Sequence, residues 1–468
     1  MKNLRTVLLL LCCWGLLPGA AHARTQQAAG AEPEAVKVWL ARNAVPLKGV
    51  EAGRKTEDLQ PLKKFLRGVS VVGLGEATHG THEFFQLKHR LVEFLVKEMG
   101  YTVFLIEASQ PATRKINEYV LEGKGDRDGA LAGQGLWAWD TKEVTALVEW
   151  MRGHNQTAAP GRKVKFLGFD MHNNEAGIDE LSAYLKAVAP DKGTAFDDWS
   201  KPLRSTGPGR QHFEYTRVSS QERHSMLSRA NELVGYLDLN RMLFTRRGPE
   251  AVAAFERALG DARVIAQFAD IYRRPDIHRN PAESRGPMRD FYMAANIKRL
   301  TEAEPAGTRF VVWAHNDHVG KYEVNMGRYL SQSFGAGYYA LGFSFNQGGF
   351  QARRLGGNVT IGALDGFDIG PAPPETVEWQ LARAGVADFL LDLRGAAMGA
   401  EVSDWFGRPR LMRSIGLGYA PGGSEPLHRL KLKETFDGLI FIDRTTRAQP
   451  NPTGLRDAWT ITSTRAER

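Results

Sequence analysis

The sequence has only two cysteines, Cys12 and Cys13, among its 468 residues. Both lie within residues 1–23, which have the features of a cleavable signal peptide. Removal of that segment would leave a chain with no thiol. This excludes a disulfide framework, a cysteine nucleophile and a thiolate metal site from the mature protein.

The predicted signal peptide has three parts. Lys2 and Arg5 make its start basic, Val7–Leu17 is an apolar run, and Ala21–Ala23 is a small-x-small cleavage site. We expect cleavage after Ala23 and therefore a periplasmic or secreted protein.

Long apolar runs and concentrated basic patches are also missing from the rest of the sequence. Nothing after residue 23 approaches the roughly 20 apolar residues of a transmembrane helix, so we expect no membrane insertion. The formal net charge is +8, but the basic residues are spread along the chain, which argues against a nucleic-acid partner. A hydrophobic content of 43% is typical of a globular protein, and no obligate protein partner is evident.

Short apolar runs alternate with amphipathic stretches, which predicts an α/β fold with a mainly parallel sheet flanked by helices. The predicted strands are Val71–Gly75, Thr102–Ile106, Val164–Phe169, Phe310–Ala314, Tyr339–Phe345, Asp388–Leu393 and Leu439–Ile442.

Four segments follow from this pattern. Residues 24–45 form a lead-in that ends in a short helix, and residues 46–193 and 282–468 form the catalytic core. Residues 194–281 form an inserted helical lobe, in which a capping box at Ser219 and Glu222 begins two long helices. The Gly- and Pro-rich stretch Gly356–Pro374 is predicted to be a loop.

Titratable residues follow the first four long strands. The first strand leads into Glu76 and His79, the second into Glu107, the third into Asp170 and His172, and the fourth into His315 and His318. Ligands of open parallel sheets bind at the carboxyl ends of the strands, so we expect these groups to share one site.

Lys88 falls on the apolar face of the helix after the first strand. A buried ammonium needs a carboxylate partner, for which Glu76 and Glu107 are the candidates, unless the side chain snorkels to an edge. His79, three residues after Glu76, has the composition of a general base with a carboxylate that fixes its tautomer. His315 and His318 could instead cap a helix or ligate a metal.

Two common motifs are excluded. Gly73-Leu74-Gly75 resembles a dinucleotide-binding turn, but Thr78 stands at the third glycine position. No Gly-x-Ser-x-Gly nucleophile elbow occurs, so hydrolysis would use water directly.

Several motifs together resemble the erythromycin esterase family. They are Gly75–Gly80, Glu83–Phe85, Lys88–His89, Glu107, Arg289–Asp290 with Met293, Ala294 and Asn296, Trp313–His318, and Phe436–Leu439 with Ile442–Asp443. The resemblance spans about Val71 to Pro450, in the same order.

This resemblance implies an α/β core with a helical lobe and a hydrolase that opens a macrolactone without an essential metal or other cofactor. It gives His79 the role of base, Glu76 that of its support and Glu107 that of a second carboxylate. His315, His318 and Lys88 would then meet the ester oxygens. Asp170, His172, Arg289 and Asn316 are our candidates for binding the small-molecule ester. Lys88 stands where antibiotic-inactivating members carry arginine, and a lysine lacks the bidentate fork of that residue, so the resemblance leaves the identity of the ester open.

Two alternatives remain open at this point. Glu76, His79, His315 and His318 could hold a divalent ion that activates water. The cleft could also capture a ligand of the cell envelope without turnover.

Overall fold

The computed structural model describes residues 34–204, 215–280, 283–356, 359–453 and 461–462. The predicted signal peptide lies outside these residues. All seven predicted long strands are present, as β2 (Val71–Leu74), β3 (Val103–Ser109), β4 (Lys165–Asp170), β5 (Phe310–Trp313), β6 (Tyr338–Arg354), β9 (Phe389–Asp392) and β13 (Gly438–Thr445). The other strands are β1 (Val45–Pro46), β7 (Val359–Ile361), β8 (Leu364–Ile369), β10 (Arg410–Arg413), β11 (Gly418–Tyr419), β12 (Leu427–Leu430) and β14 (Ile461–Thr462).

The main sheet is mixed but mostly parallel, in the order β1-β9-β13-β6-β2-β5-β3-β4, with β8 and β11 attached to β6. The strands from β13 to β4 run parallel to their neighbours, whereas β9 is antiparallel to β13 and β1 to β9. The four strands that carry the predicted site residues, β2, β5, β3 and β4, are therefore adjacent, and their carboxyl ends lie at one edge.

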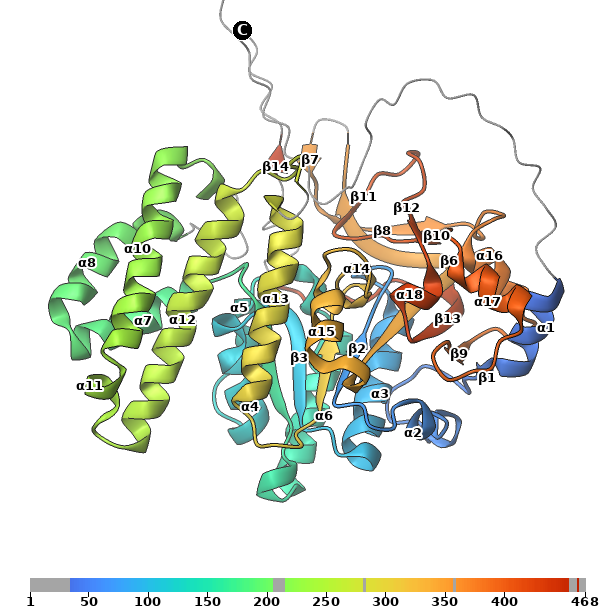
Figure 1. Cartoon of the computed structure of the whole chain (residues 1–468), viewed down its shortest axis with the longest axis horizontal. Coiled ribbons are helices and arrows are strands. Elements are labelled where there is room, and N and C mark those ends of the chain that lie inside the picture. The colour runs from blue at the N-terminus through green and yellow to red at the C-terminus, as the bar shows by residue number, and fades with distance from the viewer. Residues whose placement is uncertain (1–33, 205–214, 281–282, 357–358, 454–460, 463–468) are drawn as a thin grey trace, which may run out of the picture.

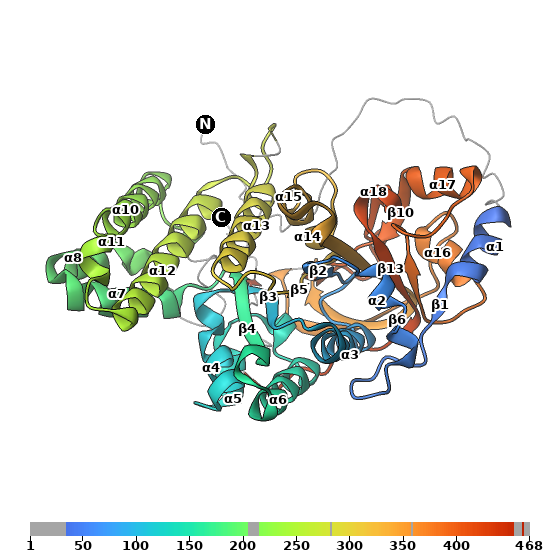
Figure 2. The same cartoon turned by 60° about the horizontal axis from the view of Figure 1, so that its bottom comes forward.

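Helices cover both faces of the sheet, as Figure 2 shows. Val72 and Phe104 pack into one core with α3 (His82–Met99), α4 (Arg114–Glu122) and α6 (Lys142–Thr157). Val71 and Val103 pack into the opposite core with α13 (Arg285–Glu302) and α15 (Met326–Phe334). Neighbouring residues of one strand point to opposite faces, so burial on both sides requires continuous apolar runs such as Val71–Leu74.

A group of helices stands at one end of the molecule, in green at the left of Figure 1. It contains α7 (Glu175–Val188), α8 (Pro190–Ser200), α10 (Ser220–Leu239), α11 (Arg241–Thr245) and α12 (Pro249–Arg273). The hydroxyl of Ser219 accepts from the N–H of Glu222, so the predicted capping box begins α10. The domain boundaries remain a prediction, and α7 already packs against α8 and α12 before residue 194.

The other α-helices of the described residues have ten residues or fewer. They are α1 (Glu34–Asn43), α2 (Leu62–Phe65), α5 (Arg127–Gly133), α14 (Asn316–Val319), α16 (Val377–Ala382), α17 (Ala400–Gly407) and α18 (Leu432–Thr435). The prediction of a loop over Gly356–Pro374 was wrong, because Leu364–Ile369 pairs antiparallel with β6 as β8. Glycines there suggested irregular backbone, but the pairing of this edge segment depends on the long partner strand β6. No helix of the described residues is long and apolar enough to cross a membrane.

Candidate active site

His79 lies in the turn between β2 and α3, beside the carboxylate of Glu76. Its Nδ1 is 2.7 Å from Oε1 of Glu76, and its Nε2 has no hydrogen-bond partner among the described residues. A carboxylate at Nδ1 holds the proton of a neutral imidazole on that nitrogen, so Nε2 keeps its lone pair. The turn lies close against β6, since a Cβ on Gly80 would come within 2.1 Å of the carbonyl oxygen of Gln351. A glycine is therefore required directly after His79.

Lys88 completes a buried ion pair with Glu76. The distance from Nζ of Lys88 to Oε2 of Glu76 is 2.6 Å, and the indole N–H of Trp313 donates to the same oxygen at 2.8 Å. Burial raises the pKa of Glu76, but Lys88 and His79 outweigh it and keep that pKa below its usual value. Glu76 is thus an ionised support for His79.

The position of Lys88 does not suit contact with a substrate. Its side chain is fully buried, and Nζ lies over the rings of Trp313 and Phe343 at 4.5 and 5.2 Å from their centroids. Burial lowers the pKa of Lys88 to about 8, although Glu76 acts in the opposite direction. The expected carboxylate partner is confirmed as Glu76, but these contacts favour a positioning role for Lys88 over that of an oxyanion donor.

Glu107 lies within β3, not after it, where the pairing of β3 with β4 is irregular between Ile106 and Ser109. Such an irregularity re-aims a side chain at a strand end. One carboxylate oxygen accepts from Arg289 at 2.7 Å, and the other accepts from the backbone N–H of His315 at 3.0 Å. Burial raises the pKa of Glu107, but His318 and Arg289 lower it well below its usual value.

Arg289 reaches the site from α13 and bridges two strands. It donates to both oxygens of Asp170 at 3.2 and 2.6 Å, as well as to Glu107. Bridging two carboxylates uses the planar fork of arginine, which a lysine lacks. The side chain of Arg289 is 12% exposed, so the cation also borders the accessible part of the site.

His318 lies between two carboxylates. Nδ1 is 2.8 Å from Asp290 and Nε2 is 3.2 Å from Glu107. Burial lowers the pKa of His318, but these carboxylates raise it well above its ordinary value, which favours the imidazolium. An N–H···N bond from Arg289, whose Nη1 is 3.0 Å from the same Nε2, would need a neutral ring. We therefore interpret Arg289 and His318 as two cations that share Glu107.

His172 connects the site to the group of helices around α12. Its Nδ1 contacts the hydroxyl of Tyr272 from α12, and Nε2 is 3.6 Å from Asp170. Burial lowers the pKa of His172 to about 4, despite the opposing effect of Asp170. A neutral imidazole at this wall can exchange hydrogen bonds with a polar ligand.

His315 lies beside His79, with 5.0 Å between the ring centroids. The ring of Trp139 also contacts His79, at 5.8 Å between centroids, and its indole N–H donates to the carbonyl of Glu107 at 2.7 Å. His315 is 2% exposed, and its Nε2 has no hydrogen-bond partner among the described residues. Two imidazoles whose Nε2 atoms have no hydrogen-bond partner among the described residues thus lie next to each other.

Asn316 is engaged elsewhere. Its amide donates to the carbonyl of Phe343 at 2.7 Å and accepts from the N–H of the same residue at 3.1 Å. These bonds fasten the turn after β5 to β6, and contact of Asn316 with a substrate stays a prediction that they do not support. Sequence reasoning missed Asp290, Trp139 and Tyr272 as site residues. Only Asp290, adjacent to Arg289, carried a local signal.

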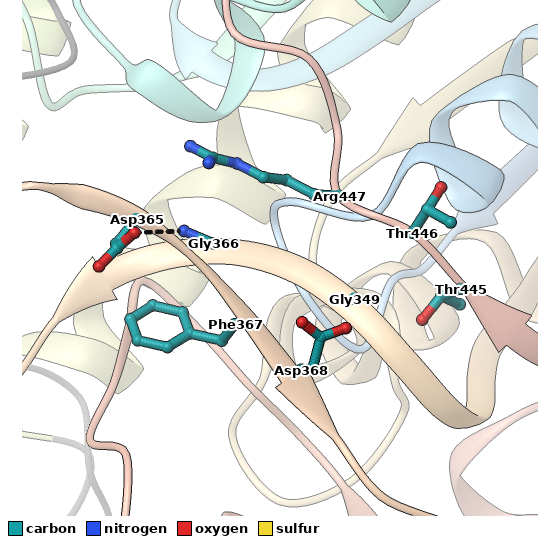
Figure 3. A pocket seen from close by; sticks show the side chains of 8 residues that line it. All are labelled: Gly349, Asp365, Gly366, Phe367, Asp368, Thr445, Thr446 and Arg447. Atoms are coloured by element: carbon teal, nitrogen blue, oxygen red, sulfur yellow. Dashed lines mark hydrogen bonds between the residues drawn. The ribbon is translucent and has the colours of Figure 1, made fainter.

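A hollow of about 320 Å³ has a lining that does not include the residues of the cluster. Figure 3 shows its side chains. It is lined by Gly349, Asp365, Gly366, Phe367, Asp368, Thr445, Thr446 and Arg447, none of which is a predicted site residue. The predicted site residues therefore belong to the cluster and not to this hollow.

The four residues considered as metal ligands, Glu76, His79, His315 and His318, are engaged in other contacts within the protein. Within the part of the chain that the structure describes, no group of three or more His, Asp or Glu side chains has the arrangement of a metal site. The ammonium of Lys88 and the indole of Trp313 share one oxygen of Glu76, and His79 takes the other. These contacts do not fit a shared ion at Glu76.

The fold and the site define the class of the protein: an α/β protein with a carboxylate–imidazole cluster at the carboxyl edge of a mostly parallel sheet. The model of the erythromycin esterase family matches residues 96–445, so the chain belongs to that family. The matched range begins after Glu76, His79 and Lys88, and is thus shorter than the resemblance seen in the sequence.

Two relatives of known sequence align over nearly their whole length. YbfO of Bacillus subtilis (strain 168), which carries an unspecific hydrolase name, is 23% identical over 94% of this chain and 97% of its own. Erythromycin esterase type II of Escherichia coli is 21% identical over 87% of this chain and 97% of its own.

Solved structures share the fold. A Bacillus cereus protein has a TM-score of 0.76 and 25% identity, covering 89% of this chain and 98% of its own. An erythromycin esterase mutant in its open conformation has a TM-score of 0.67 and 16% identity. The alignment covers 85% of this chain and 96% of the other. The predicted α/β architecture is confirmed by this likeness.

Proposed function

We propose that this protein is an exported esterase in which His79 activates water to open a carboxylic ester, with a macrolactone as the first substrate to test. The observation that carries the proposal is the bond from Nδ1 of His79 to the ionised Glu76, which leaves Nε2 free to accept a proton. Membership in the erythromycin esterase family supports the reaction class.

The reaction has two steps. In the first, water attacks the ester carbonyl carbon while its proton passes to Nε2 of His79, and the carbonyl π electrons move onto oxygen. In the second, the intermediate collapses, the C–O bond breaks and the leaving alkoxide takes the proton back. The product of a lactone is one hydroxy acid, heavier than the substrate by one water. A well-placed general base contributes about 10² to 10⁴ in rate.

Arg289 and His318 supply the positive charge of the cluster. Both are paired with Glu107, Asp170 and Asp290, so two cations meet three carboxylates and one net negative charge remains. Stabilisation of the charge that develops on a carbonyl oxygen therefore depends on oriented N–H donors and not on an excess of positive charge.

The first experiment is mass spectrometry of a fourteen-membered macrolide incubated with the protein. We expect a product heavier by one water, formed at least about 100-fold more slowly by His79→Ala because the general base is lost. The matched control is His82→Ala. His82 also pairs with a buried carboxylate, Glu143 at 2.6 Å, but lies outside the cluster, so this variant should keep its activity.

A chelator-treated sample separates water activation by His79 from activation by a metal. Activity that survives the chelator supports the proposal, whereas its loss moves the mechanism to a metal. An unchanged macrolide in every sample withdraws that substrate, and a panel of simpler esters then tests the reaction class. Saturable binding with no product from any ester would favour the capture protein.

A further inference from the structure

The carboxylate of Asp317, in the short helix α14, is held by residues from three segments. The hydroxyl of Tyr322 donates to Oδ1 at 2.9 Å, and the hydroxyl of Ser414 donates to Oδ2 at 2.9 Å. Nδ1 of His428, on β12, is 3.2 Å from Oδ1. Burial raises the pKa of Asp317, but His315 and His428 lower it well below its ordinary value. The carboxylate is therefore ionised and fixed in place.

Asp317 in turn fixes the ring of His315. The backbone N–H of Asp317 donates to Nδ1 of His315 at 3.2 Å, and Oδ2 of Asp317 lies 3.4 Å from the same nitrogen. A neutral His315 that accepts the N–H carries its proton on Nε2, and a charged His315 paired with the carboxylate also carries one there. Both arrangements make Nε2 a hydrogen-bond donor. A neutral ring with its proton on Nδ1 would lose the bond from the N–H of Asp317, and its carboxylate contact is 3.4 Å long, against 2.7 Å between Nδ1 of His79 and Glu76.

The segment that holds Asp317 also contacts the turn of His79. Ser414 and Ile415 follow β10, and the N–H of Ile415 donates to the carbonyl of Ala77 at 2.7 Å. Thr78 and Ile415 form an isolated parallel bridge. One C-terminal segment thus supports the two turns that carry His79 and His315.

We propose that Asp317, held by Tyr322, Ser414 and His428, positions His315 as an Nε2–H donor to the oxygen on which negative charge develops. This inference rests on the proposed esterase function for its catalytic part. His79 then accepts the proton of water, while His315 donates a hydrogen bond and keeps its proton. The two imidazoles have different tasks because their Nδ1 atoms have different partners.

The donor is well suited to an oxyanion. His315 is 2% exposed and its Nε2 has no partner among the described residues, so no hydrogen bond to protein need be broken when a substrate oxygen arrives. An oriented donor in a site without bulk water stabilises developing charge more than one in water. Since Nε2 is closed to solvent, substrate binding must open a path to it.

The direct test is nitrogen NMR of the full chain labelled with ¹⁵N-histidine, without substrate. The His315 signals are assigned as those lost in His315→Gln. We expect a protonated Nε2, together with either an unprotonated, hydrogen-bonded Nδ1 or a charged ring. A lone pair on Nε2 with the proton on Nδ1 overturns the inference. This measurement needs no turnover, so it separates the inference from a failure of the esterase function.

Kinetics test the catalytic part. His315→Ala should lower kcat by about 10² to 10³, with a much smaller change in KM, because a donor to the oxyanion acts in the transition state. His315→Gln, whose amide can donate, should recover part of this loss. A His315→Gln variant as slow as His315→Ala would overturn the assignment of His315 as the donor.

The role of the positioning residues is tested by substitutions that remove their contacts with Asp317 and leave His315 itself unchanged. A Tyr322→Phe and Ser414→Ala double variant, and His428→Ala, should each lower kcat about tenfold with KM nearly unchanged and with the His315 signals shifted. The control is His224→Ala, an exposed histidine on α10 that contacts only its own helix. Unchanged kcat and NMR signals in both positioning variants would refute the role of the Asp317 network.

Discussion

Replacement of Lys88 by methionine tests how much the buried ion pair between Lys88 and Glu76 contributes to the stability of the protein and to the position of His79. The shift of the Lys88 pKa from 10.5 to about 8 corresponds to roughly 3 kcal/mol against the ammonium. The buried pair is therefore costly in itself, and its two members depend on each other. Removal of one partner leaves an uncompensated buried charge, which typically costs about 3–5 kcal/mol.

We expect Lys88→Met to lose about that amount in the free energy of unfolding, measured by urea at pH 7. Glu76 can avoid part of the cost by taking up a proton, but then it no longer holds the Nδ1 proton of His79, so ester hydrolysis should also fail. The Lys88→Met, Glu76→Gln double variant should recover most of the stability, because no buried charge remains, and none of the activity.

The control is Lys97→Met. Lys97 lies on the same helix and pairs with Glu93 at 2.9 Å, but its side chain is 54% exposed, so the change should stay within about 0.5 kcal/mol. The reasoning would be refuted if Lys88→Met were as stable as this control. It would also be refuted if the stability losses of Lys88→Met and Glu76→Gln, each measured alone, added up in the double variant.

Three further predictions concern the surroundings of the site. Burial lowers the pKa of His89 from 6.5 to about 4, so the unfolded chain binds a proton there that the native state does not bind; His89 should therefore lower stability by up to about 3 kcal/mol as pH drops from about 6.5 to 4. Urea unfolding of His89→Gln should lose this part of the pH dependence, whereas the part from His172, whose pKa is also lowered to about 4, should remain. Arg289→Met should cost about 3–5 kcal/mol in the same assay, because Glu107 and Asp170 lose their shared cation; a loss below about 1 kcal/mol would contradict this. Tyr272→Phe removes the hydroxyl that contacts His172 and should lower kcat/KM about tenfold with unfolding changed by less than about 1.5 kcal/mol; equal kcat/KM for both proteins would remove Tyr272 from the site.

The sequence by itself determined the frame of the site. Continuous apolar runs specify strands that are buried on both faces, and a parallel sheet brings their carboxyl ends to one edge. Glu76, His79 and Lys88 could be paired in advance because all three lie within thirteen consecutive positions, where strand and helix geometry fixes their spacing. A lysine on an apolar helical face also predicts a buried carboxylate partner.

Only the tertiary structure decided which groups reach that edge from far along the chain. The bridge from Arg289 to Glu107 and Asp170 spans more than a hundred positions, and the contacts of Ser414 and His428 with Asp317 span about a hundred. Such contacts depend on how α13 and the β10–β12 pair dock against the sheet, and no local periodicity records that docking. For the same reason, we did not predict that β8 pairs with β6 or that Asn316 bonds to Phe343. Each of these contacts depends on β6, which lies outside the local sequence of its partner.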